Sequence, residues 1–233
     1  TNPISVWLKI NTGMNRVGIF ADQVADCVEH IRQQPLLQLV SVMTHFANAD
    51  TGLVEDVSAP MAVLQQVAKQ LPELQISACN SAAILGDNGL VDDVSRPGIM
   101  LYGSSPMIEQ SAGELGLKPV MNLMSEIISV HSVKQGDRVG YGGDWLAQRD
   151  TTLAVVAIGY GDGYPRHAPS GTPVMVEGVE CPLAGRVSMD MITVDITDHP
   201  QCEQLSLGAR VQLWGDQLDV DRIATAAGTI AYE

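Results

Sequence analysis

Tyr141 is the residue of this chain best suited to acid–base chemistry, because it stands between glycines shortly before Trp145. A loop of this kind can hold a phenol in a pocket. A tyrosine acts as a base near neutral pH only when positive charge or hydrogen bonds lower its pKa from about 10. Taken alone, the segment favours the other interpretation, a tyrosine whose ring packs over a glycine turn.

Two other segments have the residue types that bind anions. Asn80 and Ser81 follow one apolar run and open another, so either can cap a helix whose free N–H groups face an anion. In Arg96-Pro97-Gly98-Ile99 the glycine allows backbone amides to approach a phosphate closely. Taken singly, each is more often an ordinary cap or turn.

His45 follows an apolar run, at the end of a predicted strand, which is the catalytic face of a β/α barrel. A lone histidine there is more often structural. Because no further ligands cluster around it, a metal hydrolase is only a secondary hypothesis and no metal site is predicted. The segment from Arg186 to Met191 contains an Arg and an Asp that fit either a buried ion pair or a ligand contact.

The first half of the chain alternates apolar runs with amphipathic segments, which is typical of a parallel sheet with helical crossovers. The pattern predicts strands over residues 6–10, 39–43 and 74–78, helices over 21–34 and 61–71, and a continuation of the rhythm at 91–94 and 99–102.

The second half changes character. Apolar runs at residues 127–130, 153–156, 173–176 and 192–196 are separated by Gly, Pro and Asp, and only 220–227 has a helical pattern. This spacing predicts a mainly β module, a small barrel or a sandwich. We place the boundary near Leu117, giving domains over residues 1–117 and 118–233.

Composition excludes several classes of partner. The 233 residues carry a net charge of −14, which disfavours nucleic acid and anionic lipid surfaces. No apolar run approaches the roughly 18 residues of a membrane span, and no signal peptide is evident. The four cysteines form no metal-binding pair, which favours reduced thiols in a cytoplasmic protein.

In order along the chain, these segments resemble the alanine racemases that use pyridoxal phosphate. The matching segments are residues 9–18, 44–47, 80–82, 96–103, 139–145, 159–164, 185–191 and 230–233. The resemblance implies an α/β fold, with the later part of a TIM-type β/α barrel followed by an all-β C-terminal domain. It also implies a homodimer whose subunits share active sites and interconvert L- and D-alanine by two-base proton transfer, for cell-wall supply or for degradation of D-alanine.

The resemblance also assigns roles to residues. Arg96 is expected to bond the pyridine nitrogen, His45 to lie beside the ring, and Arg16 to reach the phenolic oxygen and the substrate. Lys9 is expected to be carbamylated and to hold Arg16. The residues implied in cofactor binding around the phosphate are Asn80, Ser81, Gly98, Ile99 and Tyr232, the last from the end of the second domain.

In the second domain the resemblance makes Tyr141 the base on the face opposite the cofactor lysine. Met189 and Asp190 match residues at the substrate carboxylate, and Tyr160 matches a tyrosine that lines the access path. Asn11 replaces a familiar aspartate, which is expected to alter one local hydrogen bond.

The lysine that binds the cofactor has no match in this chain, and neither has the tail beyond Glu233. We therefore expect a fragment that is inactive alone. The alternatives are a racemase for serine or for a broader range of amino acids, and a non-catalytic chain that only folds, assembles or binds phosphate ligands. Small barrel proteins that bind pyridoxal phosphate are disfavoured, because they have no β domain.

Overall fold

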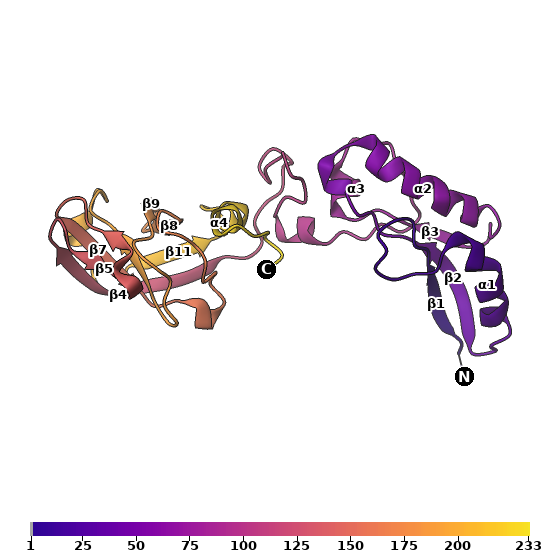
Figure 1. Cartoon of the computed structure of the whole chain (residues 1–233), viewed down its shortest axis with the longest axis horizontal. Coiled ribbons are helices and arrows are strands. Elements are labelled where there is room, and N and C mark those ends of the chain that lie inside the picture. Colours follow the sequence, from indigo (N-terminus) through magenta and orange to yellow (C-terminus); the bar gives the residue numbers. More distant parts are fainter. Residues whose placement is uncertain (1) are drawn as a thin grey trace. The chain divides into compact units, whose positions relative to one another are not determined.

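The computed structural model describes residues 2–233, which form two compact units. The β/α unit runs to Leu101 and includes Ser105–Leu115. The β unit comprises Tyr102–Ser104 and Gly116–Glu233. Indigo to magenta ribbon marks most of the first unit in Figure 1, and orange to yellow ribbon most of the second.

The β/α unit is built on a parallel sheet in the order β1-β2-β3. Its strands are β1 (Ile4–Lys9), β2 (Leu37–Met43) and β3 (Gln75–Ser77), and its helices are α1 (Val24–Arg32), α2 (Val54–Ala68) and α3 (Ser81–Leu85). Lys9 is in register with Met43, and Met43 with Ser77, so the three strands end together. The predicted β/α alternation is confirmed.

Helix α2 begins at Val54, seven residues before the predicted start at residue 61. Pro60 lies inside the helix and argues against an early start, because proline removes an N–H donor. The start is nevertheless well marked. Thr51 Oγ1 accepts from the Leu53 amide and donates to the Asp56 carboxylate, and Glu55 and Asp56 place negative charge in the first turn.

The segments at residues 91–94 and 99–102 are not strands, so that part of the prediction is wrong. Residues 99–102 form a 3-10 helix. Asp92 Oδ2 accepts from the Ala78 and Cys79 amides, both at 2.8 Å, and Asp93 Oδ2 accepts from the Ile76 amide at 2.7 Å. The amides of Asp93 and Val94 also donate to the Ile76 carbonyl, at 2.9 and 3.2 Å, so two carboxylates and two main-chain amides bond the outer edge of β3 without forming a further strand.

The β unit contains a six-stranded antiparallel sheet in the order β10-β7-β4-β11-β8-β9. A bridge between Leu183 and Val194 joins the end of β9 to β10, so the sheet closes on itself as a small barrel. The strands are β4 (Leu123–Val133), β7 (Thr151–Val156), β8 (Pro173–Val176), β9 (Val179–Pro182), β10 (Ile192–Asp195) and β11 (Arg210–Trp214).

A hairpin of β5 (Arg138–Val139) and β6 (Trp145–Leu146) projects from this barrel, and α4 (Val220–Ala227) follows it. The predicted β module and its helix are confirmed, whereas β9 and β11 were not predicted. The core alternates along the strands: Val174 and Val176, Val211 and Leu213 are all fully buried.

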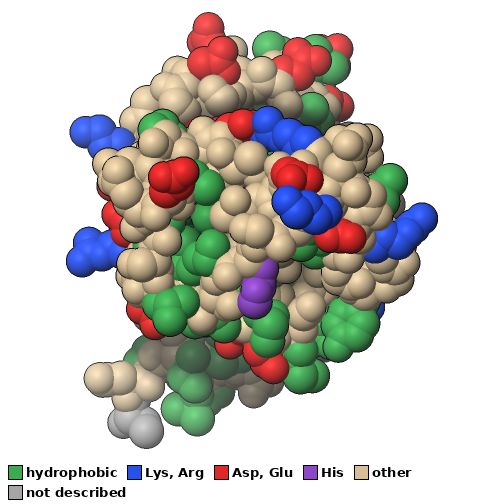
Figure 2. Space-filling view, turned by 90° about the vertical axis from the view of Figure 1, so that its left-hand side faces the viewer, with side chains coloured by type: hydrophobic (Ala, Val, Ile, Leu, Met, Phe, Trp, Pro, Cys, Tyr) green, Lys and Arg blue, Asp and Glu red, His purple; other side chains and the backbone are tan. Residues whose placement is uncertain are grey.

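Neither a membrane-spanning helix nor a metal cluster is found within residues 2–233. No helix there is long and apolar enough to cross a bilayer. No three His, Cys, Asp or Glu side chains there gather as metal ligands. On the face of the β unit shown in Figure 2, acidic and basic side chains are interspersed rather than gathered into a basic patch.

Candidate active site

The carboxyl ends of β1 and β2 are joined by a chain of hydroxyls. Thr44, directly after β2, donates through Oγ1 to the Ile10 carbonyl at 2.9 Å. Its only hydroxyl proton is then committed, so Thr12 must be the donor in the 2.6 Å contact between the two Oγ1 atoms. This fixes the place where His45 leaves β2.

Arg96 joins the ends of β2 and β3. Its Nη2 donates to the carbonyls of Thr44 at 2.6 Å and Ala78 at 3.3 Å, and its Nη1 donates to Ser77 Oγ. Burial lowers the pKa of Arg96, although a guanidinium keeps its proton in proteins. The end of the sheet therefore has a permanent positive charge held by main-chain acceptors.

The sites predicted at Lys9, Arg16, His45 and Arg96 are electrostatically one cluster. Burial, together with the charges of Arg96, Lys9 and Arg16, lowers the pKa of His45 from 6.5. Burial, together with Arg16 and Arg96, also lowers the pKa of Lys9. Within residues 2–233 neither Lys9 nor Arg16 forms an ion pair with a carboxylate. In a chain of net charge −14, this uncompensated positive charge fits an anionic ligand.

Arg16 lies on a loop that returns to the end of β1. The main-chain N–H of Asn11 donates to the Ile19 carbonyl at 2.8 Å, and the main-chain N–H of Ile19 donates to the Lys9 carbonyl at 2.9 Å. The Asn11 side chain closes the loop: Oδ1 accepts from the Gly13 and Asn15 amides, and Nδ2 donates to Asn15 Oδ1 at 2.9 Å. A carboxylate in place of Asn11 has no proton for that last bond.

Four of the residues expected at a phosphate, Asn80, Ser81, Gly98 and Ile99, lie within the β/α unit. Asn80 caps α3, since its Oδ1 accepts from the Ala83 amide at 3.0 Å. Ser81 is buried, and its Oγ accepts from the Gly98 amide at 2.7 Å, which holds the turn of Gly98 and Ile99 against α3. Tyr232 belongs to the β unit, where it is largely exposed.

In the β unit, Tyr141 begins a short 3-10 turn, Tyr141–Gly143, and its side chain is 72% exposed. Gly140, Gly142 and Gly143 all have positive φ, which an L side chain rarely adopts. Two hydrogen bonds close the turn: Gly143 N to Gly140 O at 3.1 Å, and Arg138 Nη1 to Gly143 O at 2.7 Å.

The loop over residues 185–191 lies against this turn. Arg186 Nε donates to Asp144 Oδ2 in an ion pair whose two side chains are about half exposed. A buried pair with Asp190, one of the two interpretations left open, therefore does not form. Met189 and Asp190 are exposed farther along the same loop.

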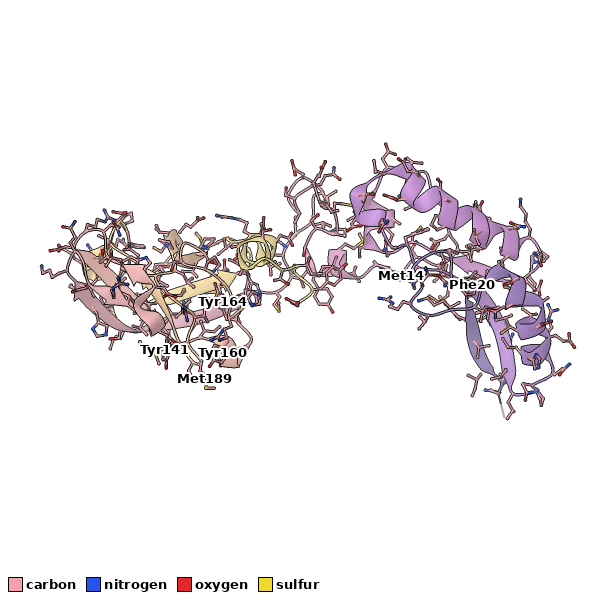
Figure 3. All side chains as sticks on the ribbon, viewed as in Figure 1. Met14, Phe20, Tyr141, Tyr160, Tyr164 and Met189 are labelled. Atoms are coloured by element: carbon pink, nitrogen blue, oxygen red, sulfur yellow. The ribbon has the colours of Figure 1, made fainter. Side chains whose placement is uncertain are left out.

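The same loop also supports Tyr160, the first residue of the 3-10 turn Tyr160–Asp162. The Tyr160 amide donates to Ser188 O at 3.0 Å, and the Gly161 amide to Met189 O at 2.7 Å. Arg166 lies 5.6 Å from the centre of the Tyr160 ring. In Figure 3, Tyr141, Tyr160 and Met189 lie along one edge of the β unit.

Four site residues were not predicted: Asp92, Arg138, Asp144 and Arg166. Asp92, Arg138 and Asp144 act through a main-chain group or a partner distant in sequence, which no local pattern reveals. Arg166 acts through the ring of Tyr160. One signal in the sequence could have indicated two of them, namely a charged residue next to a predicted site residue. Asp144 precedes Trp145, and Asp92 lies four residues before Arg96.

Comparison with known proteins gives consistent matches over nearly the whole chain. The family model described as the alanine racemase N-terminal domain matches residues 1–106, and the model of the C-terminal domain matches residues 120–233. An alanine racemase of Stutzerimonas stutzeri is 46% identical over 99% of this chain, but the match covers 63% of that relative. The chain thus spans less than two thirds of the length of such relatives.

Solved structures agree. The biosynthetic alanine racemase from Pseudomonas aeruginosa has a TM-score of 0.92 and 43% identity, over 100% of this chain and 64% of that one. An alanine racemase from Bartonella henselae with covalently bound pyridoxal phosphate has a TM-score of 0.84 and 27% identity, over 98% of this chain and 62% of that one.

Proposed function

Because the chain belongs to the alanine racemase family, we propose that the protein containing it interconverts L- and D-alanine with pyridoxal phosphate as cofactor. The observation that carries the proposal is the cationic cluster of Lys9, Arg16 and Arg96 at the ends of the strands, where within residues 2–233 neither Lys9 nor Arg16 forms an ion pair with a carboxylate. A phosphorylated pyridoxal has a dianionic phosphate and a phenolate oxygen, both of which such a cluster attracts.

The residues of the β/α unit fit this group. The Ser81 hydroxyl and the turn of Gly98 and Ile99 are adjacent, as a phosphate site requires, and Asn80 orders the helix start beside them. Arg16 is proposed at the phenolate, and Arg96 at the ring nitrogen. When bound, pyridoxal phosphate withdraws electrons from the α-carbon of an attached amino acid and so makes its proton acidic.

Lys9 is proposed to hold Arg16 after carbamylation. Its lowered pKa increases the fraction of neutral amine, the form that reacts with carbon dioxide. The product is negatively charged, so it relieves the repulsion between Lys9 and Arg16 and accepts hydrogen bonds from the guanidinium.

Tyr141 is proposed to move the proton on one face of the substrate. Racemisation needs a group on each face, and a lysine is proposed for the other. Of the four lysines here, Lys134 is paired with Asp150 on the β unit, and only Lys9 belongs to the cationic cluster. We therefore propose that the cofactor lysine is not among the four.

The β-unit residues are proposed to complete the active site of a partner subunit. Met189 would offer its backbone amide to the substrate carboxylate, with Asp190 beside it, and Tyr160 would line the access path. Support comes from the exposed apolar side chains at one edge: Tyr141 is 72% exposed and Met189 55%. A symmetric dimer uses such a surface twice. The four free thiols agree with a cytoplasmic location.

The test is a racemisation assay on the full-length protein with L-alanine, D-alanine and L-serine. Interconversion of the alanines at a rate well above that of serine supports the proposal. No turnover of any amino acid by the cofactor-loaded protein would contradict it.

Shared sites are tested by mixing two inactive variants, Tyr141→Phe and Arg96→Ala. In a mixed dimer with shared sites, one site has both substitutions and the other has none. Mixing should therefore restore activity, whereas sites confined to one subunit would stay inactive.

A further inference from the structure

Tyr141 lies in a turn whose sequence does little to restrict its backbone conformation. Three of its four nearest neighbours along the chain are glycines with positive φ, at positions 140, 142 and 143, and the phenol is mostly exposed. Glycine loses more conformational entropy on ordering than any other residue. Neither backbone preference nor side-chain packing therefore fixes the phenol.

Besides the two hydrogen bonds that close the turn, Arg186 and Asp144 lie against it. A Cβ built on Gly142 would lie 3.0 Å from Asp144 Oδ1 and 3.5 Å from Arg186 Cζ, so the ion pair lies directly against the turn. The Arg186 amide is also close, 3.6 Å from a Cβ built on Gly140. The ion pair thus lies against the turn after Tyr141, and the Arg186 main chain lies close to the turn before Tyr141.

Arg186 belongs to the loop that also holds Tyr160, since the carbonyls of Ser188 and Met189 accept the amides of Tyr160 and Gly161. One loop, residues 185–191, is therefore the common support of both tyrosine turns. Its link to the Tyr160 turn is made of main-chain bonds. Its link to the Tyr141 turn includes a single pair of side chains.

We propose that the Arg186–Asp144 ion pair is a positioning device that sets the place of the Tyr141 phenol on the loop of residues 185–191. The inference rests on the proposed function of Tyr141 as the proton-transfer group. An ion pair this exposed contributes little to stability, so its loss is expected to leave the fold intact. Misplacement of a reacting group by roughly 1 Å, in contrast, costs up to about 100-fold in rate.

The test compares Asp144→Asn, Arg186→Gln and the double variant in the full-length, cofactor-loaded protein. Each single variant should lower kcat by roughly 10- to 100-fold, with little change in KM, melting temperature or cofactor content. Because the two side chains act as a unit, the double variant should be no slower than the slower single variant.

A matched control exists in the same unit. Glu180 pairs with Arg222 and is exposed to the same extent as Asp144, with both side chains at 49%. Glu180→Gln should leave kcat unchanged. Conservative rescue is expected too: Asp144→Glu should recover more activity than Asp144→Asn, because it keeps the charge.

Three results would overturn the inference: wild-type kcat in Asp144→Asn, losses that add in the double variant, or a loss in Arg186→Gln alone, which would give Arg186 a direct role with substrate. Failure of the proposed function is distinguishable. In that case wild type does not racemise alanine, or Tyr141→Phe is as fast as wild type.

Discussion

At the scale of single residues, the end of the β/α sheet is dominated by mutual repulsion. Lys9, Arg16, His45 and Arg96 are close enough for the cations to lower the pKa values of Lys9 and His45. Such an arrangement is costly without an anion, and it is stabilised by any ligand that brings negative charge. We therefore expect binding of phosphate or its esters at this cluster to raise the free energy of unfolding.

His45 gives this cluster a measurable pH dependence. Its folded pKa is below 6.5 because burial and three cations disfavour the imidazolium. The unfolded chain then binds a proton first as pH falls, so stability is full above about pH 6.5 and is lost as pH drops through the folded pKa. His45→Gln, which does not titrate, should lose less unfolding free energy between about pH 8 and about pH 5 in urea titrations.

The control for that measurement is His167→Gln, since His167 is an exposed histidine of the β unit. Its pH dependence of stability should match that of wild type. If wild type and His45→Gln lost the same unfolding free energy between about pH 8 and about pH 5, the cationic cluster would not lower the pKa of His45.

Tyr141→Phe removes one hydroxyl and leaves the phosphate residues unchanged. Racemisation should fall by about 10²–10⁴ in both directions, the usual worth of a general acid–base group, while cofactor binding changes little. Tyr102→Phe is the control, because Tyr102 is similarly exposed in the same unit. Full activity of Tyr141→Phe in either direction would remove this tyrosine from the mechanism.

The sequence predicted the residues of the candidate site better than their partners. The Asn80 cap followed from its place before an apolar run, and the structure confirms it. The roles of Tyr141 and Met189 remain predictions. Arg186 illustrates why interaction partners are hard to predict from sequence. The carboxylate with which it forms an ion pair, Asp144, is 42 residues away, whereas Asp190 is a nearer candidate within the same segment.

At the scale of elements, the β unit depends on close contact between two loops. A Cβ at position 159 would overlap the carbonyl oxygens of Ser188 and Met189, both main-chain atoms of the supporting loop. Gly159→Ala should therefore cost about 1–3 kcal/mol in unfolding free energy and also lower activity, because the loop must shift.

Gly113→Ala is the matched control, since a Cβ there meets no atom within 4 Å and its φ is not in the left-handed region. It should be neutral or slightly stabilising. Equal stability of the two variants would mean that the loops are not packed as described.

Helices and strands were predictable where apolar residues recur with a single period along the whole element. Strands β2 and β7 and helix α4 followed from apolar periodicity alone. The prediction failed at residues 91–94. Two aspartates there bond the edge of β3 through their side chains, and such bonds leave no trace in the periodicity of apolar residues. Strand β9 was missed because it is short and includes Glu180 and Pro182.

At the scale of the whole molecule, the two units have separate cores. One core gathers around Leu8, Val42 and Leu64, and the other around Ile127, Val194 and Leu213. Apart from Tyr232, the residues proposed to bind the cofactor are in the first unit, and the proposed proton-transfer tyrosine is in the second. The proposed racemisation therefore requires both units, whereas the fold of each unit is stabilised by its own core.

This division, with the four lysines present, predicts that the 233-residue chain alone does not racemise alanine. Incubation with pyridoxal phosphate, reduction with borohydride and mapping should give no stoichiometric adduct, because none of the four lysines is proposed to bind the cofactor. A stoichiometric adduct at Lys9 accompanied by turnover would contradict both this prediction and the proposed role of Lys9.

Strand β1 pairs with β2 on one side, and on its other side the part of the chain described here provides no strand. At the end of this edge the Ile19 amide donates to the Lys9 carbonyl; the preceding part pairs with no strand among the described residues, and Ile4 and Trp7 are exposed there. An edge of this kind is a template for another strand, including β1 of a second copy. The isolated chain should therefore aggregate by edge-to-edge growth as its concentration rises, despite the repulsion expected from its net charge of −14.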